Sequence, residues 1–173
     1  YKALVANTTA KYNTAVGSYS LTSNTTGQDN VAIGYTTAKN NTTGCSNTAV
    51  GNKALCLTTT GCGNTALGMA AMRLNTTASY NTATGWNALY TNSTGTYNTA
   101  SGYRALFSNT TAGDNTASGT YTLYANTTGK YNTAHGLKAL QANTCGDSNV
   151  AVGLFSLFYN TTDSHNTAVG RYS

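Results

Sequence analysis

A single period of 17 residues runs through the whole chain, and no other feature limits the possible folds as strongly. With no insertion or deletion, asparagine recurs at Asn13, Asn30, Asn47, Asn64, Asn81, Asn98, Asn115, Asn132, Asn149 and Asn166. Counting this Asn as position 1, position 3 is always Ala and position 5 is always Gly. Position 9 is Leu except at Ala38 and Met72, and position 12 is Asn except at Thr58. A fixed period of this kind indicates a repeat architecture in which each unit stacks on the next.

The unit is too short for a pair of helices, and its residues favour strands and turns. Thr suits strands, whereas Asn and Gly suit turns. We therefore predict an all-β fold, a parallel β-solenoid of about ten 17-residue coils with two short strands per coil. The first strand is expected at N-T-A-x-G and the second at x-A-L-x-x. Residues 1–173 are expected to form one uncapped solenoid array and to be a segment of a longer fibre, because both ends follow the repeat and carry no capping unit.

Strand alternation predicts which positions face the interior. Positions 1, 3 and 5 should share the inner face, with Leu at position 9 supplying most of the apolar bulk. Position 4 varies widely and is expected to face outward. The Asn residues of positions 1 and 12 would stack into two amide ladders, or each would form a local Asx-turn in its own coil; the two interpretations stay open and are compatible.

Composition and charge exclude several classes of partner. Only 8% of residues are charged, and the nine Lys and Arg residues give a net charge of +5 without forming a run or a stripe in the sequence. We therefore predict no nucleic-acid partner. No apolar run approaches the ~20 residues of a membrane-spanning helix, so no membrane span is expected either.

The residues that could support catalysis are few and scattered. His135 and His165 occupy different positions of the repeat, and no metal-ligand spacing or phosphate-binding loop is present. The acids all fall at positions 15 to 17 in separate coils, at Asp29, Asp114, Asp147 and Asp163. Catalytic groups need fixed proximity. We expect no catalytic, cofactor-binding or metal-binding residues, no cofactor, and a protein that is not an enzyme.

Two of the four cysteines, Cys45 and Cys62, occupy position 16 of consecutive coils. Stacked coils place equivalent Cα atoms ~4.8 Å apart, inside the ~4.4–6.8 Å range of disulfides. We predict a disulfide between Cys45 and Cys62, which would suit an oxidising extracellular location. Two free thiols in a ladder are the alternative. Cys56 and Cys145 have no partner at an equivalent position and are expected to be unpaired.

The repeat also creates an Asn-x-Thr sequon at position 12 in most coils. Such sites accept N-linked glycans in secreted proteins. The candidate sites are Asn7, Asn24, Asn41, Asn75, Asn92, Asn109, Asn126 and Asn160. Because the repeat itself requires N-T-T, a purely structural turn is the favoured explanation.

Two stretches, N-V-A-I-G at 30–34 and N-V-A-V-G at 149–153, resemble the S-V-A-I-G repeat in the heads of trimeric autotransporter adhesins. The longer unit N-T-A-x-G-x-x-A-L-x-x-N-T-T-G is similar to repeats of phage tail-fibre-like and other surface proteins. The resemblance covers the whole chain and implies a left-handed parallel β-roll, often trimeric, that serves as a projecting stalk or adhesive head. The adhesin repeat is nearer 14 residues, and Thr here often replaces its buried Val.

The sequence thus predicts a structural fibre or filament segment, a shaft or adhesive stalk, at an extracellular, cell-surface or virion-surface location. The expected partners are further copies of the chain, in a homotrimer or a head-to-tail filament, and possible surface glycans. Tyrosines at variable positions are expected to serve contacts between subunits in preference to carbohydrate stacking. The alternative is a ligand-binding solenoid, either a glycan-binding adhesin or an ice-binding protein. Ice binding would need two outward Thr columns, and position 4 is too variable to supply the second.

Overall fold

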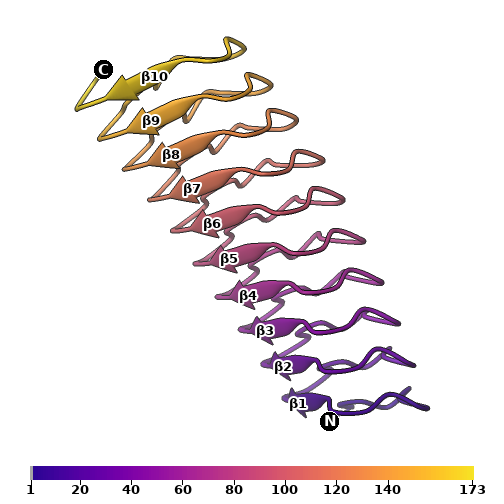
Figure 1. Cartoon of the computed structure of the whole chain (residues 1–173). Helices are drawn as coiled ribbons and strands as arrows, with labels where there is room; N and C mark the ends of the chain where they lie inside the picture. The colour runs from indigo at the N-terminus through magenta and orange to yellow at the C-terminus, as the bar shows by residue number, and fades with distance from the viewer. Residues whose placement is uncertain (1) are drawn as a thin grey trace.

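The computed structural model describes residues 2–173, which form one continuous stack of coils (Figure 1). Within this range each coil carries a single three-residue strand. The ten strands are β1 (Thr14–Val16), β2 (Val31–Ile33), β3 (Thr48–Val50), β4 (Thr65–Leu67), β5 (Thr82–Thr84), β6 (Thr99–Ser101), β7 (Thr116–Ser118), β8 (Thr133–His135), β9 (Val150–Val152) and β10 (Thr167–Val169). They form one parallel sheet in chain order. The register is constant, because the central Ala of each strand pairs with the central Ala 17 residues away. The predicted parallel β-solenoid is confirmed.

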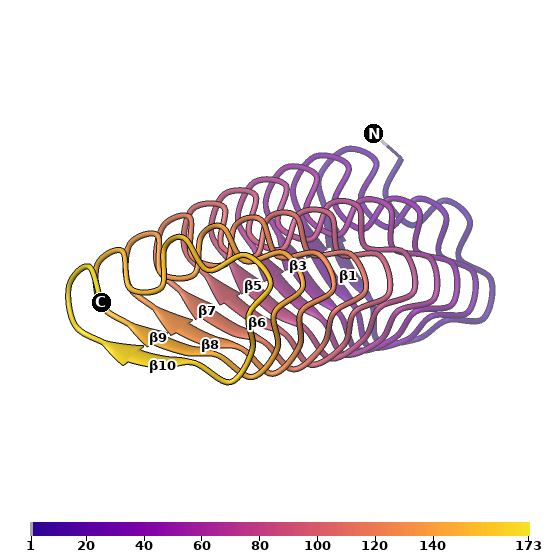
Figure 2. The ribbon, with the colours of Figure 1, turned by 90° about the horizontal axis from the view of Figure 1, so that it is seen from above.

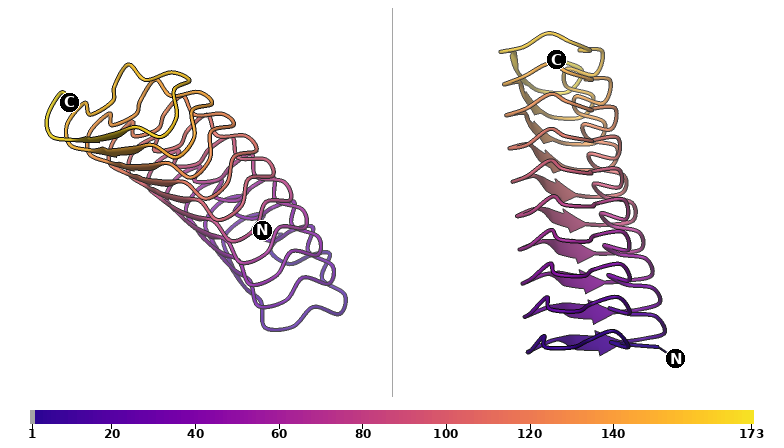
Figure 3. Two further views of the ribbon diagram at one scale, coloured as in Figure 1. Left: turned by 45° about the horizontal axis from the view of Figure 1, so that its top comes forward. Right: turned by 90° about the vertical axis from the view of Figure 1, so that its right-hand side faces the viewer.

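The coil is flattened, and the strands follow one another along one long side of it (Figure 2). The returning segments cover the other long side. The N-terminus and the C-terminus lie at opposite ends of the stack (Figure 3). Each coil takes the name of its strand, so that coil β3 contains residues 47–63.

The prediction of two strands per coil is wrong in one respect, because the x-A-L-x-x segment is a series of turns. Positions 7 and 9 both adopt positive φ, as at Arg104 (φ 54°) and Leu106 (φ 50°). These left-handed residues prevent the extended conformation that a strand requires. The segment still bonds to its neighbours, since the N–H of Leu89 donates to the carbonyl of Ala105 at 2.9 Å and that of Arg104 donates to Trp86 at 3.0 Å. The rung-to-rung backbone bonds therefore continue outside the sheet.

Position 5 is a corner of the coil and not an inner-face position, which corrects the expectation for it. The glycine of coil β5, Gly85, has φ +131°, a conformation that L side chains rarely adopt. A Cβ atom there would also lie 2.7 Å from the carbonyl oxygen of Gly102 in the next coil. Glycine is required because the chain turns sharply while the neighbouring coil lies directly against it.

The core is thin and is built from columns of small residues around one column of large ones. Position 3 is fully buried Ala in the internal coils, as at Ala66 and Ala83, and position 8 is a buried Ala, Ser or Thr. The large side chains are those of position 9, which are fully buried at Leu21, Leu55, Met72, Leu89, Leu106, Leu123 and Leu140. Each buried Leu contributes roughly 1.5–3 kcal/mol to stability. The inward predictions for positions 1, 3 and 9 are confirmed, and position 15 joins them, as buried Ala78 and Ala112 show.

Candidate functional surface

Asparagine at position 1 forms an uninterrupted ladder inside the coil. The Oδ1 atom of Asn81 accepts the backbone N–H of Asn98 at 2.9 Å and its side-chain amide at 3.2 Å. The same amide of Asn98 also donates to the carbonyl of Ala112 at 2.8 Å. The backbone bond recurs at all nine steps from Asn13 to Asn166. Each Asn side chain therefore supplies an acceptor for a backbone N–H of the following coil.

Asparagine at position 12 forms a second ladder that meets the first. The Nδ2 amide of Asn109 donates to Oδ1 of Asn92 at 2.8 Å and to the carbonyl of Ala112 at 3.0 Å. One position-15 carbonyl thus accepts from both ladders. The predicted ladders are confirmed at both positions. The Asx-turn is not formed, because Oδ1 accepts from the following coil and the local turn is closed by Nδ2 donating to the carbonyl three residues ahead.

This geometry decides what the position-12 sequons do in the folded chain. Asn24, Asn41, Asn75, Asn92, Asn109 and Asn126 are all 0–1% exposed. Their Nδ2 atoms already donate inside the coil, so a glycan at these sites is incompatible with the folded stack. The amide of Asn160 is also used, towards Asn143 and Asp163, and Asn7 is exposed. Glycosylation therefore stays a prediction at Asn7 and Asn160, and at the six buried sequons the contacts support a structural role.

The position-16 cysteines lie in adjacent coils, as the repeat predicted. The N–H of Cys45 donates to Sγ of Cys62 at 3.0 Å, and both residues are thiols in this structure, as are Cys56 and Cys145. A separate side-chain hydrogen bond between the two thiols, with burial as a second cause, raises the pKa of Cys45. The structure therefore places Cys45 and Cys62 side by side but contains no disulfide bond between them. Mass spectrometry of the non-reduced protein tests the disulfide, because two alkylated thiols would contradict it.

The outer face of the sheet is formed by positions 2 and 4. Position 2 is Thr in eight of ten coils and Val in two, and none of the twenty side chains in these two columns is Lys, Arg, Asp or Glu. The position-4 column is apolar towards the N-terminal end, where Val16 is 56%, Ile33 40% and Leu67 37% exposed. It becomes hydroxylated in the middle, at Thr84, Ser101 and Ser118. The result is a regular, uncharged face that runs the length of the stack.

One end of the flattened coil gathers aromatic and cationic side chains at positions 6, 7 and 10, which we call the aromatic–cationic edge. Tyr90, Phe107 and Tyr124 stack with centroid distances of 5.1 and 5.3 Å and interplanar angles of 9° and 13°. Arg104 lies 5.2 Å from the ring of Tyr103 and 5.4 Å from that of Phe107. The three positions become neighbours because the left-handed residues at 7 and 9 fold the segment back on itself.

A groove of about 460 Å³ lies on this edge across coils β3 to β6. It contains three cationic side chains, Lys53, Arg73 and Arg104, and the half-exposed ring of Trp86. None of its lining residues is acidic. Sequence reasoning missed this cluster, since the cations occupy different positions of the repeat and converge only once the coil is folded.

The opposite end of the coil carries all four acids. Asp147 accepts the N–H of Lys130 at 2.6 Å, and Tyr80 and Tyr97 stack at 5.4 Å on the same edge. The acids lie in separate coils, and among residues 2–173 no group of three His, Cys, Asp or Glu side chains is arranged to hold a metal ion. The expectation that the chain is not an enzyme stays a prediction.

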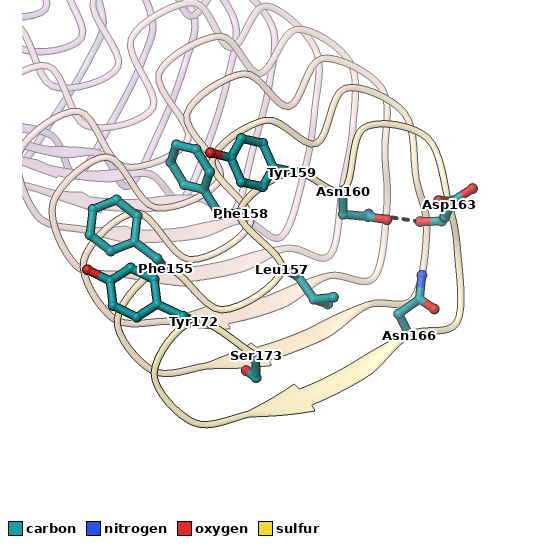
Figure 4. Close-up of a pocket in the computed structure, with 9 residues that line it drawn as sticks. All are labelled: Phe155, Leu157, Phe158, Tyr159, Asn160, Asp163, Asn166, Tyr172 and Ser173. Atoms are coloured by element: carbon teal, nitrogen blue, oxygen red, sulfur yellow. Dashed lines mark hydrogen bonds between the residues drawn. The ribbon is translucent and has the colours of Figure 1, made fainter.

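The last coil ends in a pocket of about 640 Å³ (Figure 4). Residues of coils β9 and β10 line it: Phe155 and Tyr172 lie at one end of the flattened coil, and Asp163 and Asn166 lie at the other. The pocket floor contains Leu157 and Asn160, which occupy positions 9 and 12. In internal coils the next coil covers these positions, so the pocket is the interior of the coil seen end-on.

Comparison of the chain with protein-family models, with curated proteins and with solved structures gives no match. No helix in the described part of the chain has the length and hydropathy that a membrane crossing requires. The ladders, the sheet face and the two edges of the coil are therefore the basis for assigning a function.

Proposed function

We propose that this chain is a structural rod, a segment of an extracellular or virion-surface fibre that associates with further copies of itself. The supporting observation is the position-1 ladder, which bonds every coil to the next from Asn13 to Asn166. Separating any two coils would break these bonds together with the rung-to-rung backbone bonds, and each hydrogen bond contributes about 0.5–1.5 kcal/mol to stability. A rod held in this way resists bending and local opening.

The resemblance of the N-[TV]-A-x-G stretch to adhesin heads and tail-fibre repeats supports a surface-exposed fibre. It also supports assembly into trimers or filaments. The rod would act as a shaft or stalk, and its coils would set the spacing of whatever side chains it displays.

The outer sheet face is the surface that we assign to self-association. A parallel sheet is normally covered on both faces, and this one leaves Val16, Ile33 and Leu67 exposed. The face repeats every ~4.8 Å along the stack. A second copy of the chain has the same repeat and the same absence of charge, so its side chains can interdigitate over the full length.

The size of the face indicates how strong that association should be. Ten coils at ~4.8 Å with a face ~10 Å wide would cover about 500 Å² per partner, which is at the low end for protein interfaces. Association of this segment should therefore be weak and should strengthen as coils are added.

Sedimentation velocity over a range of concentrations tests this proposal. The native chain should form dimers or larger species as concentration rises, and the double variant Ile33→Lys/Leu67→Lys should stay monomeric because it places charges in the apolar column. The matched control is Thr60→Lys/Thr94→Lys, which adds the same charge at exposed position 14. A native chain that is monomeric at every concentration, or equal loss of association in both variants, would contradict the proposal.

Ice binding is the second candidate, and the position-2 column is the observation that favours it. Thr82, Thr99 and Thr116 are exposed, spaced by one coil each, and accompanied by hydroxyls at position 4. Inhibition of ice recrystallisation by the native chain, lost in Thr99→Lys, would support this function. Unchanged growth of ice crystals in the presence of the native chain would contradict the ice-binding function.

A further inference from the structure

Charge is segregated across the coil in a way that the linear sequence hides. All four acids occupy positions 15 to 17. Seven of the nine Lys and Arg residues occupy positions 6, 7 or 10 on the aromatic–cationic edge, namely Lys2, Lys39, Lys53, Arg73, Arg104, Lys138 and Arg171. The expectation that the cations form no stripe is therefore wrong for the folded chain. One edge is positive along its whole length, and the acids lie at the other end of the coil.

Contacts within the edge hold several of these cations in place without neutralising them. The Nη1 atom of Arg73 donates to the hydroxyl of Tyr90 at 2.7 Å, and Lys138 lies 5.3 Å from the ring of Phe155. Cation–π contacts fix the position of a cation but leave its charge intact. The edge is thus organised before any ligand binds, which lowers the entropy that binding would cost.

The spacing of the cations limits the kind of anion that fits. Lys2 precedes coil β1, and the other six fall in coils β2, β3, β4, β6, β8 and β10, so most neighbours are two coils apart, about 10 Å. Duplex DNA carries one charge per ~1.7 Å. The edge therefore matches a polymer whose anionic groups are separated by uncharged units, and it is far too sparse for efficient neutralisation of a nucleic acid.

The stacking of the aromatic rings also argues against a nucleic-acid ligand. Single-stranded nucleic acids bind such surfaces by stacking bases on free aromatic faces. Here the faces within the Tyr90–Phe107–Tyr124 column are covered by the neighbouring rings, and the outer face of Tyr90 lies towards Arg73 at 5.8 Å. The groove exposes half of the Trp86 ring, a single surface and not a column on which successive bases could stack. Its Asn52 and Asn87 side chains supply hydrogen-bonding groups suited to hydroxyl-rich ligands.

We propose that the aromatic–cationic edge binds an acidic polysaccharide along the rod, with Arg73 and Arg104 holding its anionic groups in the groove and Lys53 beside them. The ligand lies lengthwise, and each further cation along the edge adds one contact. This binding surface is separate from the sheet face assigned to self-association, so either function can fail while the other stands.

The test is calorimetric titration of the native chain at low ionic strength with hyaluronan, which carries a carboxylate on every second sugar, and with keratan sulfate, which carries sulfates and no carboxylates. Binding to at least one polymer should weaken as salt is raised, and the stronger of the two identifies the anionic group. Arg73→Gln/Arg104→Gln should lose about tenfold in affinity, since each exposed charge contact contributes modestly. Lys11→Gln/Lys130→Gln removes the same charge from the opposite edge and should change affinity by less than about twofold.

Lys53→Gln/Lys138→Gln provides a second variant, because Lys53 lines the same groove and Lys138 lies further along the edge. It should also weaken binding, and it keeps the test available if Arg73→Gln/Arg104→Gln does not fold. Equal losses for cations on the two edges would show attraction by net charge alone and would overturn the proposal. Equal binding of neutral dextran, tighter binding of oligo-dT, or no binding to either acidic polymer would overturn it as well.

Discussion

The two asparagine ladders lie within a few ångströms of each other, share an acceptor, and yet differ in what they do for the fold. At position 1, Oδ1 of Asn98 accepts both the backbone N–H and the amide of Asn115. At position 12, Oδ1 of Asn109 accepts only the amide of Asn126. The first ladder satisfies a backbone group that has no backbone partner, whereas the second joins side chains and closes turns.

The repeat tolerates a change in the second ladder and none in the first. Position 12 is Thr at residue 58, and the consequence is local. Asn75 donates to the Thr58 hydroxyl at 3.2 Å, whereas the buried Oδ1 of Asn41 has no hydrogen-bond partner. An amide ladder can therefore lose one side-chain member, but a backbone N–H in the core must keep its acceptor.

The largest expected effect comes from breaking the first ladder with Asn98→Ala. The change removes the acceptor for the backbone N–H of Asn115, and it leaves Oδ1 of Asn81 with the backbone N–H of residue 98 as its one remaining donor. We expect a loss of about 3–5 kcal/mol in the free energy of unfolding, because several buried polar groups lose partners at once. Urea denaturation measures it, and a loss below about 1 kcal/mol would show that water replaces the amide.

Breaking the second ladder with Asn109→Ala should cost less. Its amide bonds to Asn92 and to the Ala112 carbonyl are lost, but that carbonyl keeps its bond from Asn98 and no backbone N–H is orphaned. A loss of about 2 kcal/mol in the free energy of unfolding is expected. If the two variants prove equally unstable in the same denaturation assay, the distinction between the ladders is wrong.

Repairing the second ladder with Thr58→Asn should stabilise the chain. The new amide would donate to the unpaired Oδ1 of Asn41 and to the carbonyl of Gly61, which now accepts only from Asn47 among the side-chain amides. A gain of about 1 kcal/mol, and a higher melting temperature, is expected. Thr60→Asn, at exposed position 14, is the control and should leave the melting temperature unchanged.

The smallest effect is expected outside both ladders, in the hydroxyl column of position 13. Thr110 donates to the carbonyl of Thr127 at 3.1 Å, and the site is only partly buried. Water can replace this bond, so Thr110→Val should cost about 0.5 kcal/mol. A loss as large as that of Asn109→Ala would mean that the hydroxyl column holds the coils together as firmly as the amides do.

The sequence predicted the coil, the inner Ala and Leu columns and both ladders, because each depends on what recurs at one position. The sequence did not predict features that depend on several positions of the repeat coming together in the folded coil. Leu at φ 50° and Arg at φ 54° are unfavourable locally, so residue propensity could not reveal the turns at Leu106 and Arg104. The rung-to-rung bonds of these turns stabilise them, and only the folded turn brings positions 6, 7 and 10 to one edge. The cationic groove could not be predicted from the sequence, because its side chains converge only after these turns have formed.

Amide hydrogen exchange followed by NMR can show whether the asparagine ladders hold the rod together, since it reports on each ladder separately. We predict slow exchange at the backbone N–H of position 1, as at Asn98 and Asn115, and similar protection in all internal coils with a minimum near Thr58. The position-1 side-chain amides should also exchange slowly. Protection confined to the strands, with the Asn98 backbone and side-chain amides exchanging freely, would contradict this role of the ladders.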